Sequence, residues 1–72
     1  MKLAPRERQV LWLRAQGMTS VAIAERLGIS YAAVRTYTTN LFNRLGADNI
    51  FEALVAVGWL KVPAEWTATK AA

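Results

Sequence analysis

The chain has 72 residues, 54% of them apolar and 19% charged, with nine Lys and Arg against five Asp and Glu. It contains neither Cys nor His, which excludes disulfides, thiolate nucleophiles and the usual zinc sites and removes the commonest general base. The length predicts one domain, and the net charge of +4 favours an acidic partner such as nucleic acid. The longest uncharged run, residues 15–24, is too short to span a membrane, and no secretion signal is present, so we expect a cytoplasmic, nucleoid-associated protein without a membrane partner.

Two helices are predicted in the first part of the chain. The first begins at Pro5, a residue suited to an initial helical turn, and ends at Gly17. The second is short, begins at Thr19 or Ser20, either of which can cap it, and ends at Gly28. Their inward faces carry Val10, Leu11 and Leu13 in the first helix, and Ile23, Ala24 and Leu27 in the second.

A longer helix follows after a turn of only three residues, 28–30. Ser30 can cap this helix, and its apolar positions recur at helical spacing as far as Gly46. A short helix, a three-residue turn that opens on Gly, and a longer helix are the arrangement of a helix-turn-helix. Because two packed helices cannot bury both of their apolar faces alone, we expect the first helix to lie across them.

The fourth predicted helix begins near Asp48 or Asn49 and runs to about residue 60, and it has two apolar stripes. The inward stripe, which should face the core, consists of Ile50, Leu54 and Val57. The outer stripe, about 100° around the helix, consists of Phe51, Val55 and Trp59. We expect a symmetric dimer to cover the outer stripe. The alternative is that a tail with Val62 and Trp66 folds back over it.

Several short blocks occur in a particular order and spacing over most of the chain. They are LAPRERQVLWL at 3–13, AQGMT at 15–19, IAERLGIS at 23–30, VRTY at 34–37, NL at 40–41, RLG at 44–46, Asn49 and EA at 52–53. Together they resemble the LuxR/GerE-type helix-turn-helix domain. The resemblance implies an all-α, four-helix domain at residues 1–62, with a three-helix core, a fourth, dimerisation-type helix, and a C-terminal tail at 63–72. It also implies that the third helix, residues 31–45, enters the major groove of DNA.

Taken by itself, the chain is similar to the stand-alone members of this family. Because the matching blocks begin at residue 3, we expect no sensing domain in front of them if these 72 residues are the full protein. We therefore expect regulation through expression level or a partner, whereas a fragment of a larger regulator would lack its sensing half.

The third helix departs from the resemblance in its charge. Family members usually carry Lys at the position of Arg35. Arg in its place keeps the positive charge and adds a planar guanidinium group that can form two hydrogen bonds to guanine. They also carry further basic residues around Thr38 and Asn43, which leaves only Arg35 and Arg44 as cations on this helix. Because phosphate contacts supply much of the affinity for DNA, we expect weaker binding or a reliance on dimerisation.

One polar stripe of the third helix is the candidate DNA-binding surface. The resemblance places Arg35, Thr36 and Thr39 toward the groove, where Arg35 would read guanine and the threonines a thymine methyl or a phosphate. The alternative is a polar face that contacts only solvent. The complete candidate set is Ser30, Tyr31, Ala32, Arg35, Thr36, Thr39, Asn40, Asn43 and Arg44.

The two ends of this stripe are expected at DNA phosphates. Backbone N–H groups at residues 31–33 can bind a phosphate, and Tyr31 can add its hydroxyl. Asn40 and Arg44 are further candidates for phosphate contacts. Packing on the turn is an equal alternative for Tyr31, and a hydrogen bond to a neighbouring helix is one for Asn40.

Trp12 lies on the outward face of the first helix, together with Arg8 and Gln16. An exposed Trp on a small domain marks a candidate protein contact, for example with RNA polymerase. Packing of Trp12 against Trp66 of the tail is an equal alternative.

The sequence predicts a regulator and not an enzyme. The five carboxylates form no catalytic pair, and neither a phosphate-binding loop nor a small-molecule site is evident, so we expect no cofactor and no metal. We predict a sequence-specific, double-stranded-DNA-binding transcriptional regulator that acts as a homodimer. The alternative is a protein-interaction module that binds another regulator or RNA polymerase through Trp12, Phe51 and Trp59.

Overall fold

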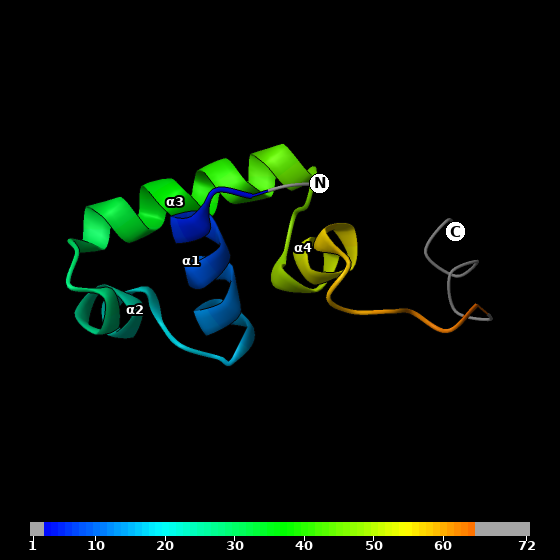
Figure 1. Ribbon diagram of the computed structural model, residues 1–72, viewed down its shortest axis with the longest axis horizontal. Helices are drawn as coiled ribbons and strands as arrows, with labels where there is room; N and C mark the ends of the chain where they lie inside the picture. The colour runs from blue at the N-terminus through cyan, green and yellow to red at the C-terminus, as the bar shows by residue number, and fades with distance from the viewer. Residues whose placement is uncertain (1–2, 65–72) are drawn as a thin grey trace.

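The computed structural model describes residues 3–64, which form four α-helices joined by short turns (Figure 1). They are α1 (Pro5–Ala15), α2 (Ser20–Leu27), α3 (Tyr31–Leu45) and α4 (Ile50–Val57). The all-α fold is confirmed, and each helix begins where the sequence predicts. In this part of the chain no helix has the length and apolar character needed to cross a bilayer. Most of the predicted tail, including Trp66, lies outside the described residues.

Side-chain caps determine where the second, third and fourth helices begin. Thr19 Oγ1 and Ser30 Oγ each accept a hydrogen bond from the N–H three residues later, at 3.1 and 3.0 Å. Asn49 Oδ1 accepts the corresponding bond from Glu52 at 2.9 Å. Each cap satisfies an N–H that the helix itself leaves without a partner and contributes about 1 kcal/mol. Of the alternatives left open by the sequence, Thr19 and Asn49 are therefore the caps.

The helix-turn-helix consists of α2 and α3, with α1 packed against both (Figure 1). At the turn, Gly28 has φ +69°, a left-handed conformation that costs little only for a residue without Cβ. Burial of each large apolar side chain between the helices contributes about 1.5–3 kcal/mol. The largest fully buried side chains come from all three helices and are Val10, Leu11, Ile23, Val34 and Leu41. The predicted crossing of the first helix over the other two is confirmed.

The inner face of α4 covers one side of this core. Ile50, Leu54 and Val57 are half-buried against it, which confirms the predicted inward stripe. Ala53, which the sequence analysis did not single out, is the deepest residue of α4 and is fully buried. Its small side chain lets the α4 backbone approach α1 and α3 closely.

The end of α4 differs from the prediction. The helix ends at Val57 and does not continue to residue 60. Gly58 has φ +87°, and the N–H of Trp59 turns back to the Leu54 carbonyl at 2.9 Å, which gives a partner to an acceptor that the helix end would leave free. The predicted outer stripe is therefore wrong at its third member, because Trp59 lies beyond the helix.

Candidate nucleic-acid interface

The polar stripe predicted on the third helix lies on the exposed side of α3. Val34 and Leu41, on the opposite side of the helix, are fully buried in the core. The helix carries two arginines and no carboxylate, so its exposed side has a net positive charge. All members of the candidate set are exposed, namely Ser30, Tyr31, Ala32, Arg35, Thr36, Thr39, Asn40, Asn43 and Arg44. Their contact with DNA stays a prediction.

The centre of this surface is a shallow hollow of about 250 Å³. It is lined by Arg35, Thr36, Thr39 and Asn40, which are neighbours at helical spacing. The guanidinium carbon of Arg35 lies 6.0 Å from the centre of the Tyr31 ring, within the range of a cation–π contact. Tyr31 is 49% exposed, so about half of its surface is open to a partner.

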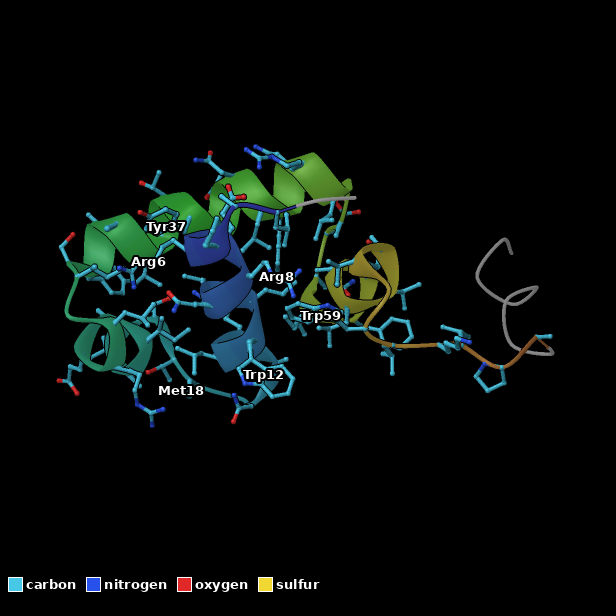
Figure 2. The ribbon with its side chains drawn as sticks, viewed as in Figure 1. Arg6, Arg8, Trp12, Met18, Tyr37 and Trp59 are labelled. Atoms are coloured by element: carbon cyan, nitrogen blue, oxygen red, sulfur yellow. The ribbon has the colours of Figure 1, made fainter. Side chains whose placement is uncertain are left out.

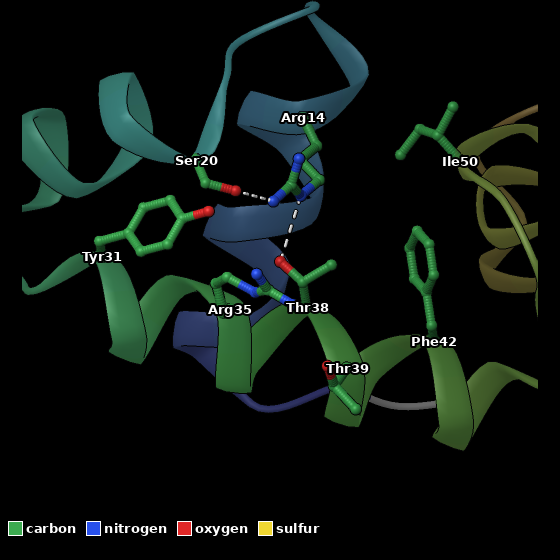
Figure 3. A pocket seen from close by; sticks show the side chains of 8 residues that line it. All are labelled: Arg14, Ser20, Tyr31, Arg35, Thr38, Thr39, Phe42 and Ile50. Carbon is green, nitrogen blue, oxygen red and sulfur yellow. Dashed lines mark hydrogen bonds between the residues drawn. The ribbon is translucent and has the colours of Figure 1, made fainter.

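A second hollow, of about 480 Å³, shares Arg35 and Thr39 with the first and is also lined by Arg14 of α1 (Figure 3). Arg14 Nε donates a hydrogen bond to Thr38 Oγ1 at 3.1 Å, and Arg14 Nη2 donates one to Ser20 Oγ. The Thr38 hydroxyl in turn donates to the carbonyl four residues earlier at 2.9 Å. The Arg14 guanidinium is thereby held between α2 and α3, at the edge of the candidate DNA-binding surface.

Arg14 is absent from the candidate site residues predicted from the sequence. Arg14 lies on the first helix, so it is not counted among the cations of the third helix. The resemblance nevertheless implies a basic residue around Thr38. In the structure the cation reaches this position from α1. The signal that could have found it is helical spacing: Glu7 and Arg14 are seven residues apart and share the face of α1 that carries Leu11. Charged groups on an inward face need partners on a neighbouring helix.

Glu7 binds the last turn of α3. Its Oε1 accepts hydrogen bonds from Arg44 Nη1 at 2.9 Å and from the Ala4 N–H at 3.0 Å, and its side chain is only 5% exposed. The Arg44 side chain is 47% exposed, so solvent still reaches part of it. The ion pair therefore gives Arg44 a structural partner in addition to its predicted phosphate contact.

The remaining carboxylates are dispersed. Residues 3–64 contain no group of three or more potential ligand side chains that could hold a metal ion. Glu52 Oε1 accepts a hydrogen bond from the Asp48 N–H at the start of α4. The exposed side chains of α3 itself thus include cations, hydroxyls and amides, which suit an anionic partner, while the Glu7 carboxylate from α1 is nearly buried against Arg44.

Trp12 packs against Trp59, from the chain that follows α4 (Figure 2). The ring centroids are 6.1 Å apart with the planes at 81°, and the guanidinium carbon of Arg8 lies 5.4 Å from the centre of the Trp59 ring. Trp12 nevertheless remains 58% exposed. Its predicted alternative partner, Trp66, lies outside the described residues.

The predicted dimer interface is divided between two places. Phe51 and Val55 are 49% and 36% exposed on α4. Trp59 is half-buried beside Trp12. Open apolar surface on α4 itself therefore comes mainly from Phe51 and Val55.

The sequence of the chain is similar to the sequences of known proteins. Residues 1–57 match the family described as bacterial regulatory proteins, luxR family. The chain is 43% identical over 47 residues to the probable transcriptional regulatory protein SgaR of Hyphomicrobium methylovorum, a match that covers 65% of this chain and 22% of that protein. It is 40% identical over 55 residues to the HTH-type transcriptional activator RamA of Corynebacterium glutamicum, which covers 76% of this chain and 20% of that protein.

The matches concern a small part of each relative. The chain spans about a fifth of the length of these two curated relatives. No solved structure matches it significantly. Since the family match extends over residues 1–57 of the 72, the chain belongs to the luxR family of bacterial regulatory proteins.

Proposed function

We propose that the chain binds double-stranded DNA sequence-specifically, with α3 in the major groove, and regulates transcription as a homodimer. The observation that carries this proposal is the exposed side of α3, where arginines, hydroxyls and amides gather without a carboxylate. The major groove of B-DNA admits an α-helix, and its base edges present donors and acceptors that such side chains can distinguish. The family and the names of the two relatives support the same function.

Arg35 is the central base-reading residue of this proposal. Its planar guanidinium matches the O6 and N7 acceptors of guanine, and the Tyr31 ring beside it limits the directions it can take. Thr36 and Thr39 flank it and can contact a thymine methyl or a phosphate. Asn43 lies one turn beyond Thr39 and offers an amide that can pair with adenine.

The start of α3 is proposed to contact a phosphate. The Ser30 hydroxyl oxygen accepts the capping hydrogen bond, so its hydrogen is left to donate to a phosphate oxygen. The backbone N–H groups of Tyr31 and Ala32 lie in the first turn, which no carbonyl of the helix can satisfy. Asn40 and Arg44 extend the phosphate contacts along the helix.

The homodimer is proposed to form through α4. Phe51 and Val55 expose apolar side chains on one helix of a small domain, and a second copy would remove both from water. A two-fold interface presents the same patch on both subunits. It would place the two copies of α3 about one DNA turn apart, roughly 34 Å, on a two-fold-symmetric site.

Recovery and sequencing of genomic fragments bound by the purified chain, at low and at moderate salt, tests the proposal. A shared, two-fold-symmetric sequence that survives the higher salt is the expected result. Absence of enrichment at both salt concentrations would contradict DNA reading.

A protein-interaction module is the second candidate, favoured by the 58% exposure of Trp12 beside Trp59. In that case Trp12 and Phe51 would contact another regulator or RNA polymerase. Binding to DNA would then show almost no dependence on salt, whereas a DNA reader loses affinity steeply as salt increases.

A further inference from the structure

We infer that the hollow beside Arg14 is a binding site for a phosphate group, supplied by the backbone of the DNA strand that flanks α3. This inference rests on the proposed function and adds a contact from α1. It also assigns to Arg14 a role that the composition of α3 does not reveal.

The lining of the hollow suits a phosphate. Arg14 and Arg35 both line it, together with the hydroxyls of Ser20 and Tyr31 (Figure 3). Thr38 also lines it, but its hydroxyl already donates its hydrogen to the carbonyl four residues earlier. None of the described lining residues is acidic. Guanidinium and hydroxyl groups form the hydrogen bonds that phosphate oxygens accept, and the volume of about 480 Å³ leaves room for one phosphate group and its neighbouring sugar.

Arg14 is preorganised for this contact. A guanidinium has five N–H groups, and two of them, at Nε and Nη2, bond to Thr38 and Ser20. The other N–H groups have no hydrogen-bond partner within residues 3–64. The Ser20 and Thr38 hydroxyls thus hold the planar guanidinium group of Arg14 in place. They do not neutralise its charge, because hydroxyls carry no charge.

The hollow beside Arg14 adjoins the candidate DNA-binding surface of α3. Arg35 and Thr39 line both this hollow and the one formed with Thr36 and Asn40. A strand whose phosphate occupies the Arg14 hollow would therefore pass directly beside the groove that Arg35 enters. The phosphate contact would fix the register of the domain while Arg35 reads the base.

Replacement of Arg14 by Met removes the positive charge and keeps a long side chain. Arg26→Met is the matched control, because Arg26 is exposed on α2 and lines neither hollow. Binding of each 72-residue variant to a random-sequence 20-base-pair duplex is measured across a series of salt concentrations. For Arg14→Met we expect the negative slope of log affinity against log salt to become shallower by about 0.9, the value for one phosphate contact. Arg14→Lys should restore the slope, and Arg26→Met should leave it unchanged.

A purely structural Arg14 would lower the stability of Arg14→Met and leave the salt slope as in the unmodified chain, which would overturn the inference. A flat slope in the unmodified chain would instead overturn the proposed function, so the two failures are distinguishable.

If Arg14→Met does not fold, the Nε–H resonance of Arg14 in the unmodified chain is followed by NMR. A saturable shift with the duplex supports the inference. A shift with inorganic phosphate but none with the duplex overturns the assignment to DNA.

Discussion

Glu7 and Arg14 lie two turns apart on one face of α1, and each bonds a different part of α3. Glu7 accepts a hydrogen bond from Arg44 in the last turn of α3, and Arg14 donates one to Thr38 in its middle. The apolar core packs α3 against α1 through the fit of its side chains, but hydrophobic burial is not directional. The two polar bonds at separate points add direction to this packing and help to hold α3 in its orientation on α1.

Loss of the Glu7 ion pair should destabilise the fold. In Arg44→Met, the nearly buried Glu7 carboxylate keeps only its bond from the Ala4 N–H. We expect the free energy of unfolding to fall by about 1–3 kcal/mol, as for a buried group that loses a partner. Urea denaturation measures this change, and Asn43→Ala, an exposed change on the same turn, should stay within about 0.5 kcal/mol of the unmodified chain. Equal effects of the two substitutions would contradict the structural role of the pair.

Arg35 should discriminate between base sequences. We expect Arg35→Ala to weaken binding to the preferred sequence by about 1–3 kcal/mol and to affect random DNA much less, because a bidentate contact to guanine is lost. Fluorescence anisotropy with both duplexes measures the difference, with Arg26→Ala as the control. An equal loss on the two duplexes would reassign Arg35 to a phosphate.

A single charge on α4 should dissociate the proposed dimer. Phe51→Glu places a carboxylate in the exposed apolar surface, and the position near the N-terminus of α4 tolerates a negative charge. We expect a monomer in sedimentation equilibrium and affinity for a two-half-site duplex that is lower by roughly tenfold or more. Val21→Glu is the control, since Val21 is 56% exposed in the first turn of α2. The same oligomeric state for both variants would place the interface elsewhere.

The turn after α4 should depend on glycine at position 58. Gly58 has φ +87°, and a Cβ built there would meet no atom within 4 Å, so only the backbone conformation opposes substitution. We expect Gly58→Ala to lower the free energy of unfolding by about 1–2 kcal/mol. It should also reduce the near-UV circular dichroism of the Trp12–Trp59 pair, whereas Gly58→Asn should show smaller effects because Asn tolerates the left-handed region. An unchanged spectrum in Gly58→Ala would show that the turn does not position Trp59.

Local patterns predicted the helices well because the relevant signals are short in range. Thr19 and Ser30 bond to N–H groups three residues away, and Gly28 ends α2 where the apolar spacing stops. The end of α4 was harder to predict, since apolar residues continue through Trp59 and only the conformation of Gly58 interrupts the helix.

The parts of the site that were missed depend on long side chains that reach across the fold. Arg14 bonds to Thr38, 24 residues later, and Glu7 bonds to Arg44, 37 residues later. No pattern along one helix contains such a pairing. Helical spacing shows only that Glu7 and Arg14 face inward, and the packing of α1 on α3 then decides which partners they meet.

The attachment of α3 to α1 has a consequence for the evolution of specificity. With 15 residues, α3 is about 22 Å long, so a pivot of about 5° around the Arg44 attachment near its end would displace its first residue by roughly 2 Å. Hydrogen bonds to base edges tolerate a spread of only about 0.5 Å. If α3 reads DNA as proposed, small substitutions in α1 would therefore change the preferred sequence while the exposed residues of α3 stay the same, and α1 would influence target choice without touching a base.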